Sequence, residues 1–194
     1  MDGFQRRREQ KKQNILEASL RLFLDFGIQK VSIAEIAKTA KVSQVTIYNY
    51  FENKHKLIHD VFIYYVDQSF EKFEVIIKSE APFHEKIQQI IFNKQAVASQ
   101  LNEEFYQHLM QEYSKEGNYI ERIYNEKAVP YFSKLFQEGK EQGYIDQDLS
   151  NEAIMFYVQM LKDYVQREDV YAKILPLTEE ITNIFFYGIV GKKE

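Results

Sequence analysis

The chain has 194 residues, of which 45% are hydrophobic and 28% are charged, and it contains only 3 prolines and 7 glycines. So few chain breakers favour an all-α protein, and the absence of cysteine excludes disulfides, thiol catalysis and cysteine-ligated metal sites. No apolar run approaches the roughly 20 residues that span a bilayer, and no hydrophobic segment follows the basic residues near the start, so we expect a cytoplasmic protein without a secretory signal.

The net charge of -4 is the sum of a positive charge on the first part of the chain and a larger negative charge on the rest. Residues 1–60 carry 11 Lys and Arg against 7 Asp and Glu, whereas the remaining residues carry 14 against 22. A basic first segment in an acidic chain indicates contact with a polyanion. The alternative is an ordinary fluctuation of solvated surface charge.

The first predicted helix covers residues 6–26. Its apolar residues recur at helical spacing, and Gly27 follows at the place where a left-handed residue would end the helix. The basic run 6–12 at its start can follow a nucleic-acid backbone as an arm, or it can be a solvated terminus.

Two short helices with a turn between them are predicted next. Ser32 and Glu35 have the spacing of a capping box, which satisfies free amides at a helix start. Ser43 can cap the following helix, which ends near Phe51. This is the layout of a helix-turn-helix motif. Asn53 can cap a fourth helix, whose apolar residues again keep helical spacing.

The few breakers after the fourth helix mark links between helices. Pro82 lies between a helix that ends near residue 79 and another that starts near residue 84. Gly117 and Asn118 separate a helix around 105–113 from a longer one that begins near Tyr119. Pro130 lies inside that longer helix and should kink or interrupt it, because proline lacks the amide hydrogen and its ring clashes with the preceding turn.

Two further helices close the chain, giving about nine in all. Residues 143–148 form a loop, and Ser150 is a plausible cap for a helix over 150–167. Residues 176–178 introduce the last helix, over 178–190. Both helices carry more apolar residues than one core face requires, which predicts a second buried face. A larger monomeric core is the alternative to a dimer interface.

Residues 31–57, VSIAEIAKTAKVSQVTIYNYFENKHKL, strongly resemble the DNA-binding signature of the TetR family of bacterial regulators. The Phe26-Gly27 pair also looks like the family, whereas beyond residue 65 the likeness rests on the number of helices. The resemblance implies an all-α protein with a three-helix helix-turn-helix DNA-binding domain at 1–53 and a helical ligand-binding and dimerisation domain at 54–194.

Two residues depart from the family pattern. Lys41 replaces the usual turn glycine, so a non-glycine residue should adopt a left-handed conformation at a cost of roughly 1 kcal/mol. Val45 stands where a smaller residue is common, at the point of closest approach to the duplex. The recognition helix should therefore sit slightly further out or read a methyl group.

The start of the second short helix should face base edges if it is a recognition helix. Gln44 can pair with adenine, and Val45 or the methyl group of Thr46 can contact a thymine methyl. Family resemblance implies that further side chains reach phosphates, which gives the full expected set of DNA-binding residues: Ser32, Ser43, Gln44, Val45, Thr46, Tyr48, Tyr50 and Lys54.

Three of these residues also have structural interpretations. Tyr48 and Tyr50 can be packed aromatics with a polar tip, and Lys54 can be a solvated lysine. A cation at a helix start is electrostatically unfavourable, and a phosphate would relieve it because the free amides and the lysine both favour an anion.

Residues after 65 are rich in Phe and Tyr, which core packing can explain. Family resemblance implies a pocket for an apolar or aromatic effector among the central helices. Candidate lining residues are Phe105, Tyr106, His108 and Met110. The resemblance also implies a homodimer that uses the last two helices and matches a pseudo-palindromic operator.

The sequence therefore predicts a DNA-binding transcription regulator, most often a repressor in this family, that a small-molecule effector releases from its operator. The alternative is a helical small-molecule sensor or carrier that has lost DNA binding. An enzyme has only the pair His55 and His59 in its favour, at metal-ligand spacing but without a third ligand nearby. We expect no enzyme, cofactor or metal.

Overall fold

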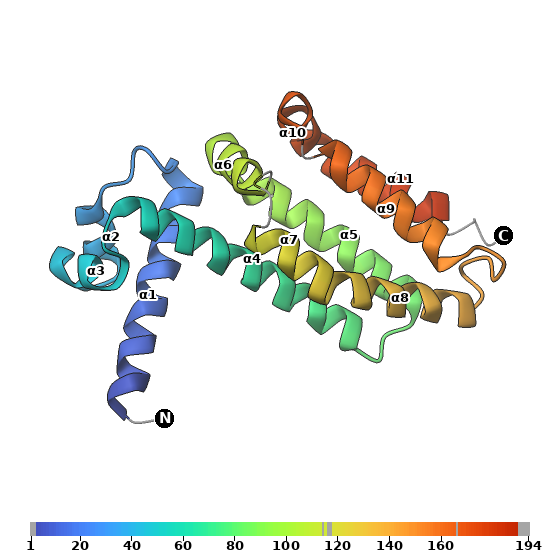
Figure 1. Cartoon of the computed structure of the whole chain (residues 1–194), viewed down its shortest axis with the longest axis horizontal. Helices are drawn as coiled ribbons and strands as arrows, with labels where there is room; N and C mark the ends of the chain where they lie inside the picture. The colour runs from blue at the N-terminus through green and yellow to red at the C-terminus, as the bar shows by residue number, and fades with distance from the viewer. Residues whose placement is uncertain (1–2, 114, 116–117, 166, 190–194) are drawn as a thin grey trace. The chain divides into compact units, whose positions relative to one another are not determined.

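The computed structural model describes residues 3–113, 115, 118–165 and 167–189, without the side chains of 94–99, 113, 165, 168, 171–172 and 189. Every regular element in these residues is a helix (Figure 1), which confirms the all-α prediction. None of the helices described is both long and apolar enough to cross a membrane. Gly117 and Val190, which the sequence placed in a link and at the end of the last helix, lie outside the described residues.

The chain forms two compact units. The first consists of the residues up to Gln68 together with Asn102–Phe105, and the second consists of Ser69–Leu101 and the residues from Tyr106 onward. Helices α4 (Lys54–Lys78) and α6 (Glu103–Tyr113) both begin in the first unit and continue in the second. The expected domain boundary after residue 53 is the position at which α4 starts.

Four helices build the first unit around one core. Helix α1 (Gly3–Phe26) is followed by α2 (Ile33–Thr39), α3 (Gln44–Phe51) and the first part of α4. Burial of each large apolar side chain contributes roughly 1.5–3 kcal/mol to the stability of the folded state, and this burial holds the short α2 and α3 in place. Among the apolar side chains of these four helices in the first unit, those that are at most 1% exposed are Ile15, Phe23, Ile36, Ile47, Phe51, Leu57 and Val61.

The local signals for these helices are confirmed. Gly27 ends α1 with a φ of 85°, and Ser32 with Glu35 forms the capping box of α2. Lys41 has a φ of 55°, so the position of the usual turn glycine keeps the left-handed conformation with a lysine in it. Ser43 caps α3 as expected. The helix-turn-helix geometry is therefore complete.

The start of α6 completes the first unit by closing the end of α1. The amide nitrogen Nδ2 of Asn102 donates to the carbonyl oxygens of Phe23 and Leu24, both at 2.7 Å. Oδ1 of Asn102 accepts a hydrogen bond from the backbone amide of Phe105 at 2.8 Å. One side chain thus pairs carbonyls at the end of α1 and an amide at the start of α6.

Glu104 holds the loop that follows α1. Its Oε1 accepts a hydrogen bond from the amide of Gln29 at 2.9 Å, and a side chain at Gly27 would collide with its carboxylate. Gly27 is therefore required both by its positive φ and by this close approach.

Helices α5 (Phe83–Gln100), α8 (Val129–Glu141), α9 (Asn151–Val165) and α11 (Thr178–Ile189) pack against one another in the second unit (Figure 1). Helix α5 contacts both α8 and α11, and α8 contacts α9. Their shared core has at its centre side chains that are at most 2% exposed, namely Ile77, Phe83, Leu135, Phe136, Ile145 and Ile154.

Pro130 interrupts its helix as predicted. The segment starts as α7 (Tyr119–Ile123), widens into a π-helical turn (Tyr124–Ala128) and continues as α8. The amide of Val129 donates to the carbonyl oxygen of Tyr124, five residues earlier. The wider turn lies directly before the proline, whose missing amide hydrogen breaks the regular pattern. The sequence did not predict the short α10 (Glu168–Ile174), which precedes a 3-10 turn at Leu175–Leu177.

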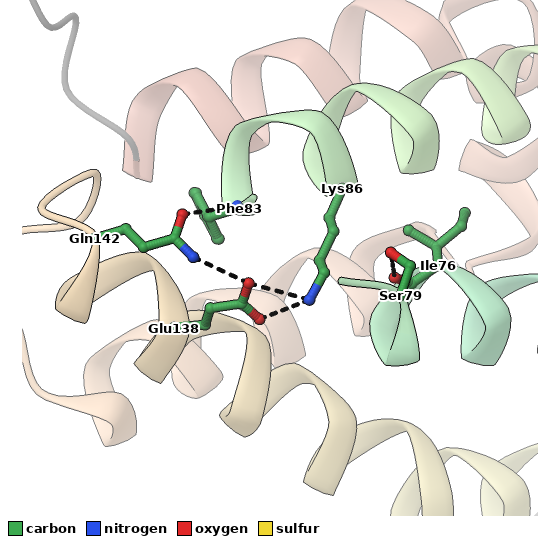
Figure 2. A network of polar contacts seen from close by, with 6 residues as sticks. All are labelled: Ile76, Ser79, Phe83, Lys86, Glu138 and Gln142. Carbon is green, nitrogen blue, oxygen red and sulfur yellow. Dashed lines mark hydrogen bonds and ion pairs between the residues drawn. The ribbon is translucent and has the colours of Figure 1, made fainter. Parts of the chain in front are cut away.

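A buried ion pair joins α5 to α8 (Figure 2). The ammonium of Lys86, a residue only 4% exposed, lies 3.0 and 2.8 Å from the carboxylate oxygens of Glu138. Gln142 donates to Glu138 at 3.1 Å and accepts a hydrogen bond from the amide of Phe83 at 2.9 Å. Gly139 lets the two helices approach closely here, because a side-chain carbon at this position would lie 2.8 Å from the ring of Phe83.

Candidate nucleic-acid interface

Helix α3 has one buried face and one exposed face. Ile47 and Phe51 are buried in the core of the first unit, 1% and 0% exposed. Gln44 is exposed, and Val45 and Tyr48 are 67% and 46% exposed. Because Val45 and Tyr48 are three residues apart, they adjoin on the exposed face of α3, which gives this face the character of a contact surface.

Asn49 also lies on this exposed face, and the sequence interpretation did not select it. It follows Val45 by four residues, a spacing that places the two side chains on the same side of a helix. Asparagine can form two hydrogen bonds with adenine in the major groove. The spacing from Val45 was the signal in the sequence that could have identified it.

Ser43 and Thr46 use their hydroxyl groups in the cap of α3. Oγ of Ser43 accepts a hydrogen bond from the amide of Thr46 at 3.0 Å and lies 2.8 Å from Oγ1 of Thr46. The contact between the two hydroxyls consumes one hydroxyl hydrogen. The other hydroxyl hydrogen of the pair can still be donated outward, for instance to a phosphate oxygen.

Ser32 is committed to the capping box of α2. Its amide and its hydroxyl both donate to Oε2 of Glu35 at 2.7 Å, and its Oγ accepts from the amide of Glu35 at 3.2 Å. The side-chain and backbone hydrogen bonds from Ser32, with a smaller contribution from the charge of Lys54, hold the pKa of Glu35 below its ordinary value. The amide and the hydroxyl of Ser32 both donate within the cap of α2, and the phosphate contact of Ser32 stays a prediction.

The polar ends of Tyr50 and Lys54 turn toward the protein. The hydroxyl of Tyr50 donates to the carbonyl oxygen of Arg8 at 3.1 Å. The ammonium of Lys54 donates to the carbonyl oxygens of Ile28 at 3.1 Å and of Val31 at 2.6 Å. The structure thus brings Gln44, Val45, Thr46 and Tyr48 together on α3, whereas Tyr50 and Lys54 bind backbone groups of α1 and of the loop after it.

The four candidate effector residues lie in different environments. Phe105 is fully buried in the first unit, with its ring centroid 5.1 Å from that of Phe62 and 5.4 Å from that of Tyr65. Tyr106 is 8% exposed, and His108 and Met110 are partly buried. These three belong to the second unit. Phe105 therefore serves the core of the helix-turn-helix unit.

A shallow hollow of about 650 Å³ lies over α5. Its lining is mostly polar, which does not match the expected apolar or aromatic effector. The lining residues are His84, Glu85, Gln88, Gln89, Phe92 and Asn93.

Comparison with known proteins supports the geometry of the first unit. The model of bacterial regulatory proteins of the tetR family matches residues 15–61, which extend from the middle of α1 to the first turns of α4. Residues 15–61, which contain the helix-turn-helix, therefore resemble the DNA-binding part of tetR-family regulators. The family match thus covers α2, the turn at Lys41 and α3, the elements on which the candidate surface lies.

Two curated relatives come from Bacillus subtilis. The HTH-type transcriptional regulator YhgD is 32% identical over 82 residues, which cover 42% of this chain and 43% of YhgD. The HTH-type transcriptional regulator YuxN is 27% identical over 180 residues, which cover 91% of this chain and 54% of YuxN. The chain spans about half the length of the curated relatives that it matches.

The chain resembles a solved helical protein in fold over most of its length. The transcriptional regulator FadR from Bacillus subtilis, solved in complex with stearoyl-CoA, has a TM-score of 0.59 at 19% identity. The match covers 94% of this chain and 99% of that chain. At this identity the likeness shows the helical fold of both units together with their order along the chain.

Proposed function

We propose that this protein is a transcriptional regulator that binds double-stranded DNA by placing α3 in the major groove. The exposed face of α3 carries the proposal, because Gln44, Val45 and Asn49 are side chains suited to base edges on a TetR-type helix-turn-helix. The excess of basic residues in 1–60 supports it, since DNA attracts that part of an otherwise acidic chain. Binding to chromosomal DNA implies a cytoplasmic protein.

The contacts fall into two kinds under this proposal. Gln44, Val45 and Asn49 read bases, and the hydroxyls of Thr46 and Tyr48 bind phosphates. Ser43 supports Thr46 through the hydroxyl pair that caps α3.

We propose a homodimer formed through α9 and α11. Three large side chains on α9 recur every four residues and are at least half exposed, and α11 carries two more. A two-fold dimer presents two copies of α3 to half-sites one helical turn apart, about 34–36 Å. The exposed side chains are Phe156, Met160 and Tyr164 on α9, and Ile184 and Tyr187 on α11. Light scattering should give twice the 23.2 kDa mass of the chain, and a particle of 23.2 kDa would contradict the dimer.

We propose further that an apolar or aromatic effector binds in the second unit and releases the protein from its operator, so that the protein acts as a repressor. Helices α4 and α6 run from one unit into the other, so a ligand that shifts either helix can change the helix-turn-helix. The FadR complex with stearoyl-CoA supports a ligand with a long apolar chain for this fold. Catalysis has no place in this cycle, and we propose none.

The effector proposal is tested by thermal shift. The full chain is heated with a panel of apolar and aromatic molecules that includes a long-chain acyl-CoA. A ligand that raises the melting temperature should also weaken DNA binding. A panel that gives no thermal shift would count against this part of the proposal and leave DNA binding unaffected.

The DNA-binding proposal is tested by selection. The full chain is incubated with random-sequence duplexes, and the bound fraction is amplified and sequenced over several rounds. We expect a pseudo-palindrome with half-site centres about 10–10.5 base pairs apart, or a multiple of that spacing. The absence of any enriched sequence would favour the alternative, a helical sensor or carrier that has lost DNA binding.

A further inference from the structure

Lys54 connects the first turn of α4 to the loop between α1 and α2. Its ammonium donates to the carbonyl oxygen at each end of the segment 28–31, at 3.1 Å from Ile28 and at 2.6 Å from Val31. The side chains of Ile28 and Val31 are 3% and 2% exposed, so both ends of this segment are anchored in the core of the first unit, while Gln29 and Lys30 between them are exposed. Both hydrogen bonds are partly buried. A single cation therefore binds the two anchored ends of this loop segment to another helix.

These hydrogen bonds also offset the unfavourable electrostatics of a lysine at the start of a helix. A cation at the first residue of a helix is repelled by the positive end of the helix dipole. Two carbonyl oxygens compensate for this, since their partial negative charges face the ammonium directly. The helix start itself is capped by Asn53, whose Oδ1 accepts a hydrogen bond from the amide of Lys56 at 2.9 Å. No external anion is needed to explain a lysine at this position.

The loop held by Lys54 leads directly into α2. Val31 precedes Ser32, the N-cap of α2, and α2 packs against α3. The position of Val31 therefore sets where α2 begins, and α2 in turn supports α3. The effect of Lys54 on the pKa of Glu35 agrees with an ammonium that lies close to this helix start.

We propose that Lys54 is a positioning residue, which fixes the loop between α1 and α2 and thereby orients α3. The expected effect of Lys54 on DNA binding rests on the proposed function. The expected effect of Lys54 on the structure of the loop does not depend on DNA. A positioning residue and a phosphate contact differ in two measurable quantities, namely the exchange of loop amides in the free protein and the slope of log K against log salt concentration.

The experiment uses Lys54→Met in the full chain, with Lys56→Met as the matched control. Methionine keeps the unbranched stem and removes the charge and the donors. Lys56 is exposed two residues away on the same helix and pairs only with Asp60 among the described residues, at 2.7 Å, so its replacement removes the same charge without touching the loop. Hydrogen exchange of residues 27–36 is measured without DNA, and binding to a selected duplex is titrated at four salt concentrations.

The positioning role predicts that Lys54→Met speeds loop exchange by about tenfold or more in the free protein, because two charge-assisted hydrogen bonds are lost. DNA binding should weaken by a similar factor, with a salt slope like that of Lys56→Met. A phosphate contact would instead leave loop exchange unchanged and make the slope shallower by about one per half-site relative to the control. That result would overturn the proposal.

A second variant keeps the test decisive if Lys54→Met does not fold. Lys54→Gln keeps an N–H donor on a shorter side chain without the charge, so loop exchange should lie between those of the methionine variant and the original protein. Exchange in Lys54→Gln equal to that of the original protein would contradict the positioning role. If the original protein binds no DNA at all, the proposed function fails while loop exchange still decides the role of Lys54.

Discussion

The buried pair Lys86 and Glu138 should respond very differently to loss of each partner. The side chain of Lys86 is 5% exposed and that of Glu138 is 22% exposed. Glu138→Leu leaves an ammonium buried without its counter-ion. Lys86→Met leaves a carboxylate that water can reach and that still accepts a hydrogen bond from Gln142 (Figure 2). The glutamate variant should therefore be the less stable of the two.

The magnitude follows from the exposure of each partner. Removal of one member of a buried pair costs about 3–5 kcal/mol. We expect a loss of about 3 kcal/mol for Glu138→Leu, at the low end because the pair is not completely buried. For Lys86→Met we expect a loss of stability of about 1 kcal/mol, since the methionine side chain replaces the aliphatic part of the lysine in an apolar environment. A loss of 3 kcal/mol in a chain of this size lowers the melting temperature by roughly 6–12 °C.

The double variant Lys86→Met with Glu138→Leu completes the cycle. Because well-packed apolar residues often replace a buried pair without loss, it should be only about 1 kcal/mol less stable than the original protein. Stability is measured by urea unfolding of all four proteins. Lys78→Met, which breaks the more exposed pair with Glu74 and removes the ammonium 5.7 Å from the centre of the Tyr131 ring, serves as a control that should cost no more than about 1 kcal/mol. Equal losses in the two single variants, or a double variant as unstable as Glu138→Leu, would refute this reasoning.

Three further changes test local features of the first unit. Asn102→Ala leaves α1 carbonyl and α6 amide groups unpaired, so urea unfolding should show a loss of about 1–3 kcal/mol, and an unchanged midpoint would contradict this. Lys41→Gly should raise stability by about 0.5–1 kcal/mol, because glycine accepts the left-handed conformation, whereas a lower melting temperature would show that the lysine itself stabilises the turn. Since hydrogen bonds from Ser32 lower the pKa of Glu35, the capping box stabilises the protein above the ordinary carboxyl pKa and loses this as pH falls through the lowered pKa. Glu35→Gln should reduce that part of the pH dependence of the melting temperature, and an unchanged profile would count against it.

The features that could be predicted from the sequence are those set by neighbouring residues. Ser32 and Glu35 form a capping box because they are three residues apart, and Gly27 ends α1 because glycine readily adopts the positive φ of that position. Pro130 interrupts its helix through its missing amide hydrogen. The exposed face of α3 could be predicted as well, since helical spacing separates Val45 from Ile47.

The features that could not be predicted depend on residues far apart in the chain. Lys54 contacts Val31, 23 residues earlier, and nothing in the local sequence distinguishes this contact from a phosphate contact. Phe105 is in the core of the first unit because α6 starts against α1, an approach that composition and spacing do not reveal. Helix α10 has seven residues like α2, but Arg167 precedes it in place of a capping residue such as the Ser32 that marks the start of α2.

The proposal that α3 reads DNA is tested most directly by Gln44→Ala. Binding to the selected operator and to all its single-base variants is titrated at several salt concentrations, with Gln137→Ala on the exposed side of α8 as a control. Loss of Gln44 should reduce discrimination by about 1–3 kcal/mol at one base pair in each half-site and leave the salt slope nearly unchanged. Equal weakening on every sequence, or no change in DNA binding, would contradict the placement of α3 in the major groove.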